Sequence, residues 1–581
     1  MQSPQPPPKG DATHSSEHHD DPRFASQPAR VADPEKTTTT VLSEAQAGVQ
    51  RIEAAASVWP KWHLVAAYGM IWLIYVITSL QEVVVRAFTP FVTSAFALHS
   101  LLAATYIFSS IIAGLAKLPL AKILDLWGRP QGMTLMLVIW VIGFIMMAAC
   151  NGVEMFAAAQ VFSAVGAQGV SYCLTVFIAD TSSLRNRGLA LAWATSPFIF
   201  TVFAGGPMAD AIIRGPGWRW GFGIFAILTP AVVAPMILLF YWNQHRAKKL
   251  GTLTSQKHHF SIKSAKSLAV EFDVLGVLLL AAGMALFLTP LSIYSYQEHQ
   301  WRSPLIICLI IFGGLLIIVF VLYEYFLAPV NFVPVHMLAN RNVLLSGIAL
   351  LFVFFNASVW GSYFSSMLMV VWNQTITNAT YISNIYRPGS CLSALVFGVL
   401  IRWTRRFKWV ALYFAIPLMM LGVGLMINFR QPDTDIGYIV MTQVFTAFAG
   451  GPIVICVELA MMSTVTHQEI AAIIAILDLF GSVGTAVGST VSAAIWTGSF
   501  PAALRRHLPP DAPIGSIYSS LYSQLGYVAG SPIRQGIALA YAESQRYMLV
   551  TSVCLLAAAL ICVVFWRDVK LEDKQVKGVV L

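Results

Sequence analysis

Charge is scarce in this sequence. Asp, Glu, Lys and Arg together make up 11% of the 581 residues, whereas 57% of the residues are hydrophobic. An ordinary soluble domain carries about 25% charged residues. The mean hydropathy of +0.69 reflects the same imbalance. The composition therefore excludes an ordinary soluble enzyme or binding domain, and it predicts an integral membrane protein.

Motifs for covalent, metal or phosphate chemistry are also lacking. The seven cysteines form no CxxC or CxxH spacing, which argues against a disulfide framework or a structural zinc site. The chain has no HExxH, GxSxG or phosphate-binding glycine motif in a suitable context, so we expect neither an enzyme, nor a cofactor, nor a metal site. No basic stripe with stacking aromatics accompanies the net charge of +9, so nucleic-acid binding is not indicated.

Apolar segments long enough to cross a bilayer recur along the chain. A spanning helix needs roughly 20 mainly apolar residues. Fourteen such segments lie near residues 63–88, 98–120, 131–150, 153–179, 188–213, 219–242, 274–293, 304–326, 343–371, 380–401, 409–428, 436–462, 470–499 and 547–566. The sequence thus predicts an all-α integral membrane protein with fourteen transmembrane helices.

The loops suggest how these helices are grouped. Basic loops follow both the second segment (AKILDLWGRPQG) and the tenth (LIRWTRRFKW), as expected if two inserted helices separate two related six-helix bundles. The predicted divisions are a disordered cytoplasmic tail at 1–58, an N-terminal six-helix bundle at 59–242, a cytoplasmic loop at 243–273, two inserted helices at 274–342, a C-terminal six-helix bundle at 343–566 that carries a long outer loop at 500–546, and a cytoplasmic tail at 567–581.

Basic residues predict the orientation of the chain. With a cytoplasmic N-terminus, the inner loops hold fifteen Lys and Arg residues and the outer loops before the last helix hold five. Two glycosylation sequons, at Asn373 and Asn378, then fall in the outer loop between the ninth and tenth helices, in agreement with this orientation. The net positive charge therefore reflects membrane topology.

The loop after the second helix carries a recognisable signature. Asp125, Gly128 and Arg129 in AKILDLWGRP match the loop motif G-x-x-x-D-R-x-G-R-R of the major facilitator superfamily, which the chain resembles. Gly128 permits a tight turn, and Arg129 can pair with a carboxylate or cap a helix C-terminus. We interpret Asp125, Gly128 and Arg129 as a conformational gate that sets the balance between inward-open and outward-open states.

Further stretches resemble one branch of that superfamily. EAAASVWPKW before the first helix, AFALHSLLAATYIFSSIIAGLAKLPLAKILDLWGR through the second, TVTHQEIAAI and AYAESQRYM together resemble the fungal siderophore-iron transporters, which are similar to drug:proton antiporters. The resemblance implies the major facilitator fold and proton-coupled import of ferric hydroxamate siderophores. Its implied partners are the ferric siderophore, protons and the bilayer, and we expect a monomer.

Two departures from related patterns leave other functions open. The fourth helix lacks the Arg of the antiporter motif R-x-x-Q-G, and Gln81 and Glu82 stand where many siderophore transporters carry an Asp. A drug or glutathione:proton exporter and a non-transporting siderophore receptor remain alternatives. The expected location is the plasma membrane, with an endosomal or vacuolar membrane as the alternative.

Polar and aromatic residues inside the predicted helices are candidates for the substrate cavity, because a bulky chelate requires aromatic walls and scattered hydrogen-bond groups. These candidates are Trp72, Tyr75, Gln81, Tyr106, Gln168, Tyr172, Asn356, Trp360, Tyr363, Tyr386 and Gln443. A chelator that fills the iron coordination sphere leaves no position for a protein ligand, so iron is expected to travel as part of the substrate.

Charged residues within the membrane cost free energy and are therefore candidates for proton coupling. They are Glu82, Arg86, Arg387, Glu458 and Asp478. Glu82 and Arg86 lie four residues apart and are expected to pair on one helix face. Pro388 and Gly389 are expected to break the tenth helix beside Arg387, and Lys117 is expected to snorkel toward the membrane surface.

The long outer loop is the last candidate element. It carries Tyr518, Tyr522 and Tyr527 and is expected to act as a lid, since long ordered loops often do.

Overall fold

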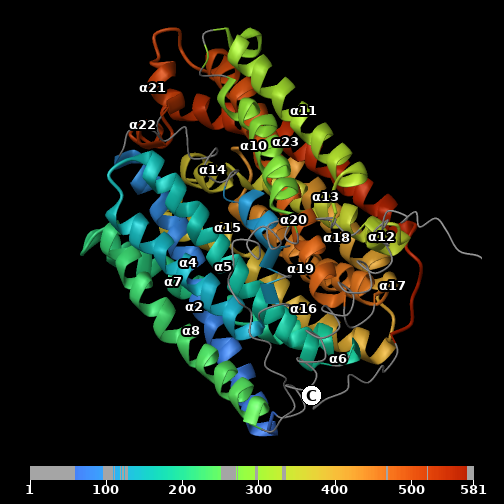
Figure 1. Ribbon diagram of the computed structural model, residues 1–581. Coiled ribbons are helices and arrows are strands. Elements are labelled where there is room, and N and C mark those ends of the chain that lie inside the picture. Colours follow the sequence, from blue (N-terminus) through green and yellow to red (C-terminus); the bar gives the residue numbers. More distant parts are fainter. Residues whose placement is uncertain are drawn as a thin grey trace, which may run out of the picture. The chain divides into compact units, whose positions relative to one another are not determined.

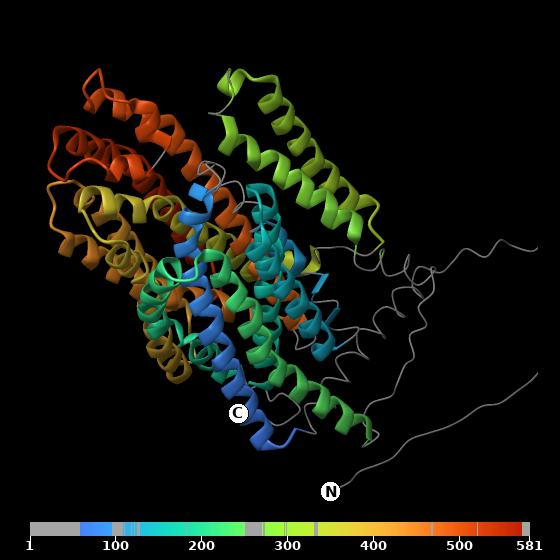
Figure 2. The ribbon, with the colours of Figure 1, turned by 90° about the vertical axis from the view of Figure 1, so that its left-hand side faces the viewer.

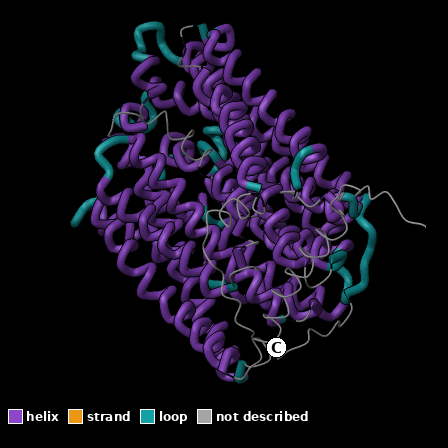
Figure 3. Tube along the Cα trace, viewed as in Figure 1, coloured by secondary structure: helices purple, strands orange, loops and turns teal. Residues whose placement is uncertain are grey.

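All elements of the structure, a computed structural model, are helical in the part of the chain that it describes (Figure 3). That part comprises residues 59–95, 109, 111–117, 119–120, 123–124, 128–182, 184–249, 270, 273–294, 297, 299–329, 335–465, 469–519 and 521–571. These residues all belong to one compact unit within residues 45–581. The predicted tail at 1–58 and the cytoplasmic loop near 251–269 lie outside the described residues.

The N-terminal helices pack against one another, and we call them the N-terminal bundle. They are α2 (Lys61–Ala95), α4 (Arg129–Ala149), α5 (Val153–Thr181), α6 (Leu184–Thr195), α7 (Phe198–Arg214) and α8 (Trp218–Lys249). Helix α4 lies against α5 and α8, and α2 lies against α7 and α8. Most of the predicted second helix, near 98–120, lies outside the described residues.

Two apolar helices follow as a hairpin. They are α10 (Val274–Ile293) and α11 (Pro304–Phe326), joined through the short η3 (Gln300–Arg302). They lie side by side, and α10 also contacts α20 (Ile470–His507) (Figure 2). Their bounds agree with the segments predicted near 274–293 and 304–326.

The remaining helices form what we call the C-terminal bundle (Figure 1). Besides α20, they are α12 (Val335–Leu338), α13 (Arg341–Gly361), α14 (Phe364–Val371), α15 (Ile376–Ser383), α16 (Tyr386–Thr404), α17 (Lys408–Val410), η4 (Ala411–Ala415), α18 (Ile416–Phe429), α19 (Ile436–Met462), α21 (Ile514–Ser519), α22 (Leu521–Leu525) and α23 (Pro532–Val564). The segment η4 is a π-helical turn.

Twelve helical segments of the described chain are long and apolar enough to cross a membrane. Helix α10 is a shorter apolar helix over the described residues, with Val274–Pro290 as its apolar stretch. The all-helical membrane fold is therefore confirmed. The count of fourteen stays a prediction, because the segment near 98–120 is largely undescribed.

Three of the spans are interrupted, and their sequences explain why. The predicted tenth helix divides into α15 and α16 at Asn384 and Ile385. Pro388 lacks an N–H and its ring collides with the carbonyl four residues earlier, which belongs to Asn384. Pro197 likewise lies at the junction of α6 and α7. The break between α13 and α14 follows Gly361.

The helices beside the predicted outer loop are longer than expected. Helix α20 has 38 residues and extends to His507, and α23 has 33 residues and begins at Pro532. At 1.5 Å per residue, α20 is roughly 57 Å long, well beyond the roughly 30 Å of a hydrocarbon core. The connection between them therefore shrinks to residues 508–531, and it contains two short helices of its own.

Candidate substrate pathway and its two latches

An ion pair joins the two bundles near the predicted outer side of the membrane. Glu82 of α2 accepts hydrogen bonds from both terminal nitrogens of Arg387 on α16, and Nη1 of Arg387 lies 2.5 Å from Oε2 of Glu82. Nη2 of Arg86 lies 3.1 Å from Oε1 of Glu82, which confirms the expected pair on one helix face. We call the Glu82–Arg387 pair the outer latch.

Local structure positions the outer latch. Arg387 lies in the first turn of α16, directly after the break that Pro388 imposes. Its guanidinium carbon lies 5.3 Å from the ring centre of Phe198 on α7, close enough for a cation–π contact. The side chain of Arg387 is 21% exposed and that of Glu82 is 37% exposed, so water only partly screens the pair.

The bundles also meet beside the outer latch. The ring of Tyr381 on α15 lies 5.9 Å from that of Phe203 on α7, and the Tyr381 hydroxyl donates to the Phe203 carbonyl at 3.4 Å. A cavity of about 20 Å³ lies beside this contact and is lined by Ala87, Gly206, Ala209, Asp210, Ile213, Thr377 and Thr380. This cavity is far too small for a chelate.

A second ion pair joins the bundles toward the predicted inner side. Nζ of Lys117 lies 2.9 Å from Oδ2 of Asp478 on α20 and donates at 2.9 Å to Oε1 of Gln168 on α5. The Lys117 side chain is only 7% exposed. The expectation that Lys117 snorkels to the surface is wrong, because a carboxylate and an amide bind its ammonium group inside the protein. We call the Lys117–Asp478 pair the inner latch.

Glu458 lies next to the inner latch. It stands four residues before the end of α19, and its carboxylate interacts electrostatically with Asp478 and Tyr75. The Tyr75 hydroxyl is 3.1 Å from Oγ of Ser171 on α5. Among the described residues, Glu458 forms no ion pair, whereas Asp478 holds Lys117. Lys117 thus pairs with Asp478, and a second carboxylate, that of Glu458, interacts electrostatically with Asp478.

The predicted conformational gate is only partly described. Asp125 lies outside the described residues. Gly128 has φ of +107°, a conformation that side-chain-bearing residues rarely adopt, which explains the glycine. Nη2 of Arg129 lies 3.0 Å from Oδ2 of Asp180 at the end of α5, and both side chains are about 10% exposed. Asp180 is thus a carboxylate partner of Arg129, and sequence reasoning missed it.

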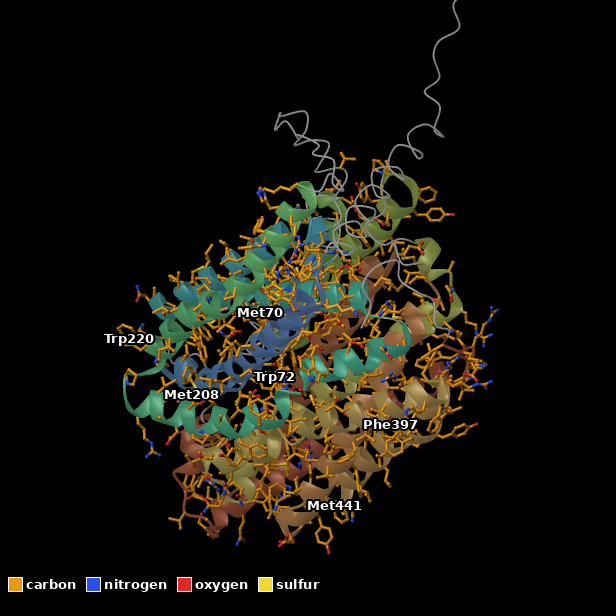
Figure 4. The ribbon with its side chains drawn as sticks, turned by 90° about the horizontal axis from the view of Figure 1, so that it is seen from below. Met70, Trp72, Met208, Trp220, Phe397 and Met441 are labelled. Atoms are coloured by element: carbon orange, nitrogen blue, oxygen red, sulfur yellow. The ribbon has the colours of Figure 1, made fainter. Side chains whose placement is uncertain are left out.

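The cavity candidates divide among different parts of the protein. Trp72 donates to Oγ of Ser196 at 3.0 Å, at the break before α7 (Figure 4). Tyr75 and Gln168 belong to the surroundings of the inner latch. Gln81 donates to Thr229 of α8 and Tyr172 is buried in the core, so both lie within the N-terminal bundle. Tyr106 is outside the described residues.

A second group of candidates lies inside the C-terminal bundle. Asn356, Trp360 and Tyr386 line one cavity of about 10 Å³ together with Val353, Ala357, Met419 and Thr446. Gln443 is fully buried in the same bundle and donates to the sulfur of Met426 at 3.8 Å. The described candidates therefore lie in different parts of the two bundles, and their role in a substrate cavity stays a prediction.

The outer connection packs firmly onto the C-terminal bundle. Trp496 of α20 stacks on Tyr363 at 4.1 Å and on Phe500 at 3.9 Å. Tyr518 and Tyr527 pack against this cluster, while the side chain of Tyr522 is not described. The outer connection is thus a cap that packs onto an aromatic cluster of α20 and Tyr363, and its predicted role as a lid stays a prediction.

Basic side chains from distant positions cap several helix C-termini. Arg430 donates at 3.0 Å to the carbonyl of Trp360, next to the end of α13. Arg534 donates to the Met369 and Val370 carbonyls at the end of α14, at 3.0 and 2.8 Å. Arg187 and Arg219 act in the same way on α5 and α4. Cations at these ends offset the partial negative charge of the last carbonyls.

The sequon asparagines Asn373 and Asn378 are both exposed, which leaves them accessible to glycosylation.

In the described chain no group of three or more His, Cys, Asp or Glu side chains could hold a metal ion.

Comparisons with known proteins agree with this geometry. The profile of the Major Facilitator Superfamily matches residues 71–489. The human organic anion transporter MFSD10 (TETRAN) has a TM-score of 0.51 at 12% identity, covering 86% of this chain and 100% of that one. The proton:xylose symporter XylE has a TM-score of 0.50 at 13% identity, covering 90% and 99%. These likenesses show the fold. The chain belongs to the Major Facilitator Superfamily, whose members are transporters and not enzymes.

Much closer relatives define the branch. The chain is 50% identical over 543 residues to "MFS siderochrome iron transporter 1" of Ajellomyces capsulatus, covering 93% of this chain and 92% of the relative. It is 42% identical to "MFS siderochrome iron transporter D" of Aspergillus fumigatus, with 92% and 90% covered, and 37% identical to "Siderophore iron transporter mirB" of Emericella nidulans, with 92% and 89% covered. Within the superfamily, the chain belongs to the fungal siderophore-iron transporter family, as the sequence resemblance predicted.

Proposed function

We propose that this protein imports ferric siderophores of the hydroxamate type by proton-coupled transport across the plasma membrane. The observation that carries the proposal is the 50% identity, over 93% of the chain, to a siderochrome iron transporter. Iron is carried as a chelate, so the protein handles the organic shell of the complex and supplies no ligand to the metal.

The two latches fit such a transport cycle. Opening to the outside requires the Glu82–Arg387 pair to separate, and opening to the inside requires the Lys117–Asp478 pair to separate. Each pair joins helices of different bundles, so each opposes the rocking motion at its own side of the membrane. With both pairs formed, the arrangement fits a stage of the cycle in which neither the outer nor the inner latch has separated.

The pathway is suited to a large, weakly charged cargo. Tyr75 and Gln168 lie in the surroundings of the inner latch and Trp72 lies at the break before α7, and these side chains offer aromatic surface and hydrogen-bond groups. Hydroxamate chelates present carbonyl oxygens and amide groups, which such side chains can bind once the bundles separate.

Uptake measurements test the proposal. The chain is expressed in yeast cells that lack their own siderophore carriers, and cells are given radiolabelled iron bound to a hydroxamate or to a catecholate siderophore. Accumulation of the hydroxamate complex that a protonophore abolishes is the expected result. Binding without accumulation would identify a receptor, and faster loss of preloaded cargo would identify an exporter. Fluorescent tagging tests the plasma-membrane location.

A further inference from the structure

We propose that Arg430 forms a binding site for one small monovalent anion, of the halide class, inside the C-terminal bundle. This site is separate from the two latches and does not depend on the proposed transport cycle. Arg430 is the first residue after α18 and is only 1% exposed. A buried cation without an opposite charge is costly, because the protein interior solvates charge much less well than water does.

The charge of Arg430 is not neutralised by a carboxylate in the part of the chain that the structure describes. The loop that follows carries Asp433 and Asp435, but both are exposed, and Asp435 instead caps the start of α19. The ring centres of Phe364 and Trp360 lie 4.1 and 5.2 Å from the guanidinium carbon of Arg430. Cation–π contacts of this kind attract the cation but supply no opposite charge.

Arg534, a second buried arginine of the same bundle, has a fully bonded guanidinium group. Its Nε, Nη1 and Nη2 atoms each donate to a different backbone carbonyl oxygen. In Arg430, Nη1 donates to the Trp360 carbonyl at 3.0 Å and to Oε1 of Gln545 at 2.8 Å. Nη2 of Arg430 contacts only the sulfur of Met426, at 3.3 Å, and Nε has no partner among the described residues. Arg430 therefore keeps donors that Arg534 has used.

Two fully buried glutamines next to Arg430 present further donors. Nε2 of Gln545, whose oxygen binds Arg430, has no partner among the described residues. Nε2 of Gln443 lies 3.8 Å from the same Met426 sulfur that Arg430 contacts, and sulfur is a weak acceptor. Oε1 of Gln443 is also unpaired, so four nitrogen atoms without an oxygen acceptor lie near one unpaired oxygen. This excess of donors around a cation fits an anion, which only accepts.

Size narrows the class of anion. The cavity that Trp360 lines has a volume of about 10 Å³, close to what a single water molecule needs. A halide ion consists of one atom, whereas sulfate, phosphate and carboxylates have several. Arg430 also lies where the chain leaves α18 on the predicted outer side of the membrane, so the path from the outer solution to the site is short.

Thermal unfolding of the purified full-length protein in detergent tests the proposal. The protein is dialysed into sodium gluconate and then titrated with sodium chloride or sodium bromide at constant ionic strength. We expect the unfolding temperature to rise by several degrees with either halide, because an anion that binds only the folded state stabilises it. Radiolabelled chloride should bind at one ion per chain over the same range of concentration. Gluconate is too large for the site and should have no such effect.

Three variants locate the site. Arg430→Met removes the charge at similar side-chain length and should abolish the halide-dependent rise. Arg534→Met is the matched control, because it removes a buried arginine of the same bundle, and its unfolding temperature should be lower but should still rise with chloride. Gln545→Leu removes one donor and should raise the half-maximal chloride concentration about tenfold, the factor that corresponds to about 1.4 kcal/mol.

Each outcome supports or overturns the anion site. Identical unfolding temperatures of the wild type in gluconate and chloride would show that the donors of Arg430 need no anion. A chloride-dependent rise that persists in folded Arg430→Met would place the site elsewhere and would also overturn the inference. Should Arg430→Met fail to fold, Gln545→Leu decides, because an unchanged half-maximal chloride concentration would contradict the proposal. None of these measurements involves cargo, so failure of the proposed function would leave their interpretation unchanged.

Discussion

Arg387 offers a direct test of the outer latch. Arg387→Gln removes the cation that joins α16 to Glu82 while keeping a polar side chain of intermediate length. Glu82 then retains only Arg86, whose side chain is 63% exposed and which lies on the same helix. Among the described residues, no ion pair would then connect the two bundles at this position, and the outward-open state should become more populated.

The free-energy change caused by Arg387→Gln can be bounded from the exposed fractions of the two paired side chains. Exposed ion pairs contribute about 0.2–1 kcal/mol, whereas loss of one partner of a buried pair costs about 3–5 kcal/mol. The side chains of Glu82 and Arg387 are 37% and 21% exposed, so the pair lies between these limits and nearer the lower one. We expect about 1–2 kcal/mol, which raises the outward-open to closed ratio roughly 5- to 30-fold.

Cysteine labelling measures this ratio. Ala87→Cys places a thiol beside the small cavity on the outer side, and a membrane-impermeant maleimide should label it roughly 5- to 30-fold faster when combined with Arg387→Gln. Arg214→Ala is the control, since Arg214 is 79% exposed and its partner, Asp210, belongs to the same helix. The swapped variant Glu82→Arg with Arg387→Glu should restore slow labelling. Wild-type labelling rates in Arg387→Gln would refute the reasoning.

Three further predictions concern other parts of the chain. Asp180→Asn removes a carboxylate partner of Arg129. Initial uptake rates should show a lower maximal rate with little change in the cargo concentration for half-maximal uptake. A changed half-maximal concentration at an unchanged maximal rate would argue against a gate. Arg534→Ala leaves the carbonyls of Met369, Val370 and Gln524 without their donor. The loss of about 1.5–3 kcal/mol per charged hydrogen bond should lower the thermal unfolding temperature in detergent. Arg505→Ala, at an exposed residue, should leave that temperature unchanged. Asn373→Gln and Asn378→Gln should each remove one step of glycan mass on a gel, and unchanged mobility of both would show that neither sequon is used.

Local patterns predicted much of the fold. The apolar runs indicated the helices because a bilayer requires about 20 apolar residues in sequence. Pro388 indicated the break in the tenth helix, and spacing by four indicated the Glu82–Arg86 pair. Hydropathy could not predict where α20 ends. Apolar residues mark only the part of a helix that crosses the membrane, whereas α20 continues through polar residues such as Arg505 and Arg506.

The pairs that join the bundles were not predictable in the same way. Arg387 lies 305 positions after Glu82, and no local period connects them. The sequence around Lys117 does not reveal its partner, Asp478, because Asp478 lies on a helix of the other bundle. Each charged residue could be recognised as unusual from its apolar surroundings, but the choice of partner depends on how the bundles dock.

The two latches have opposite polarity, and this has a consequence for assembly. The N-terminal bundle contributes the acid on the outer side and the base on the inner side, whereas the C-terminal bundle contributes the base outside and the acid inside. Two apolar helix surfaces could associate in many registers, because apolar side chains pack almost equally well in each register. A shift of one bundle along the other by the spacing of the latches would bring like charges together or leave charges unpaired, at a cost of several kcal/mol. The same four residues therefore give the newly synthesised halves one favoured way to fit together, before any cargo is bound.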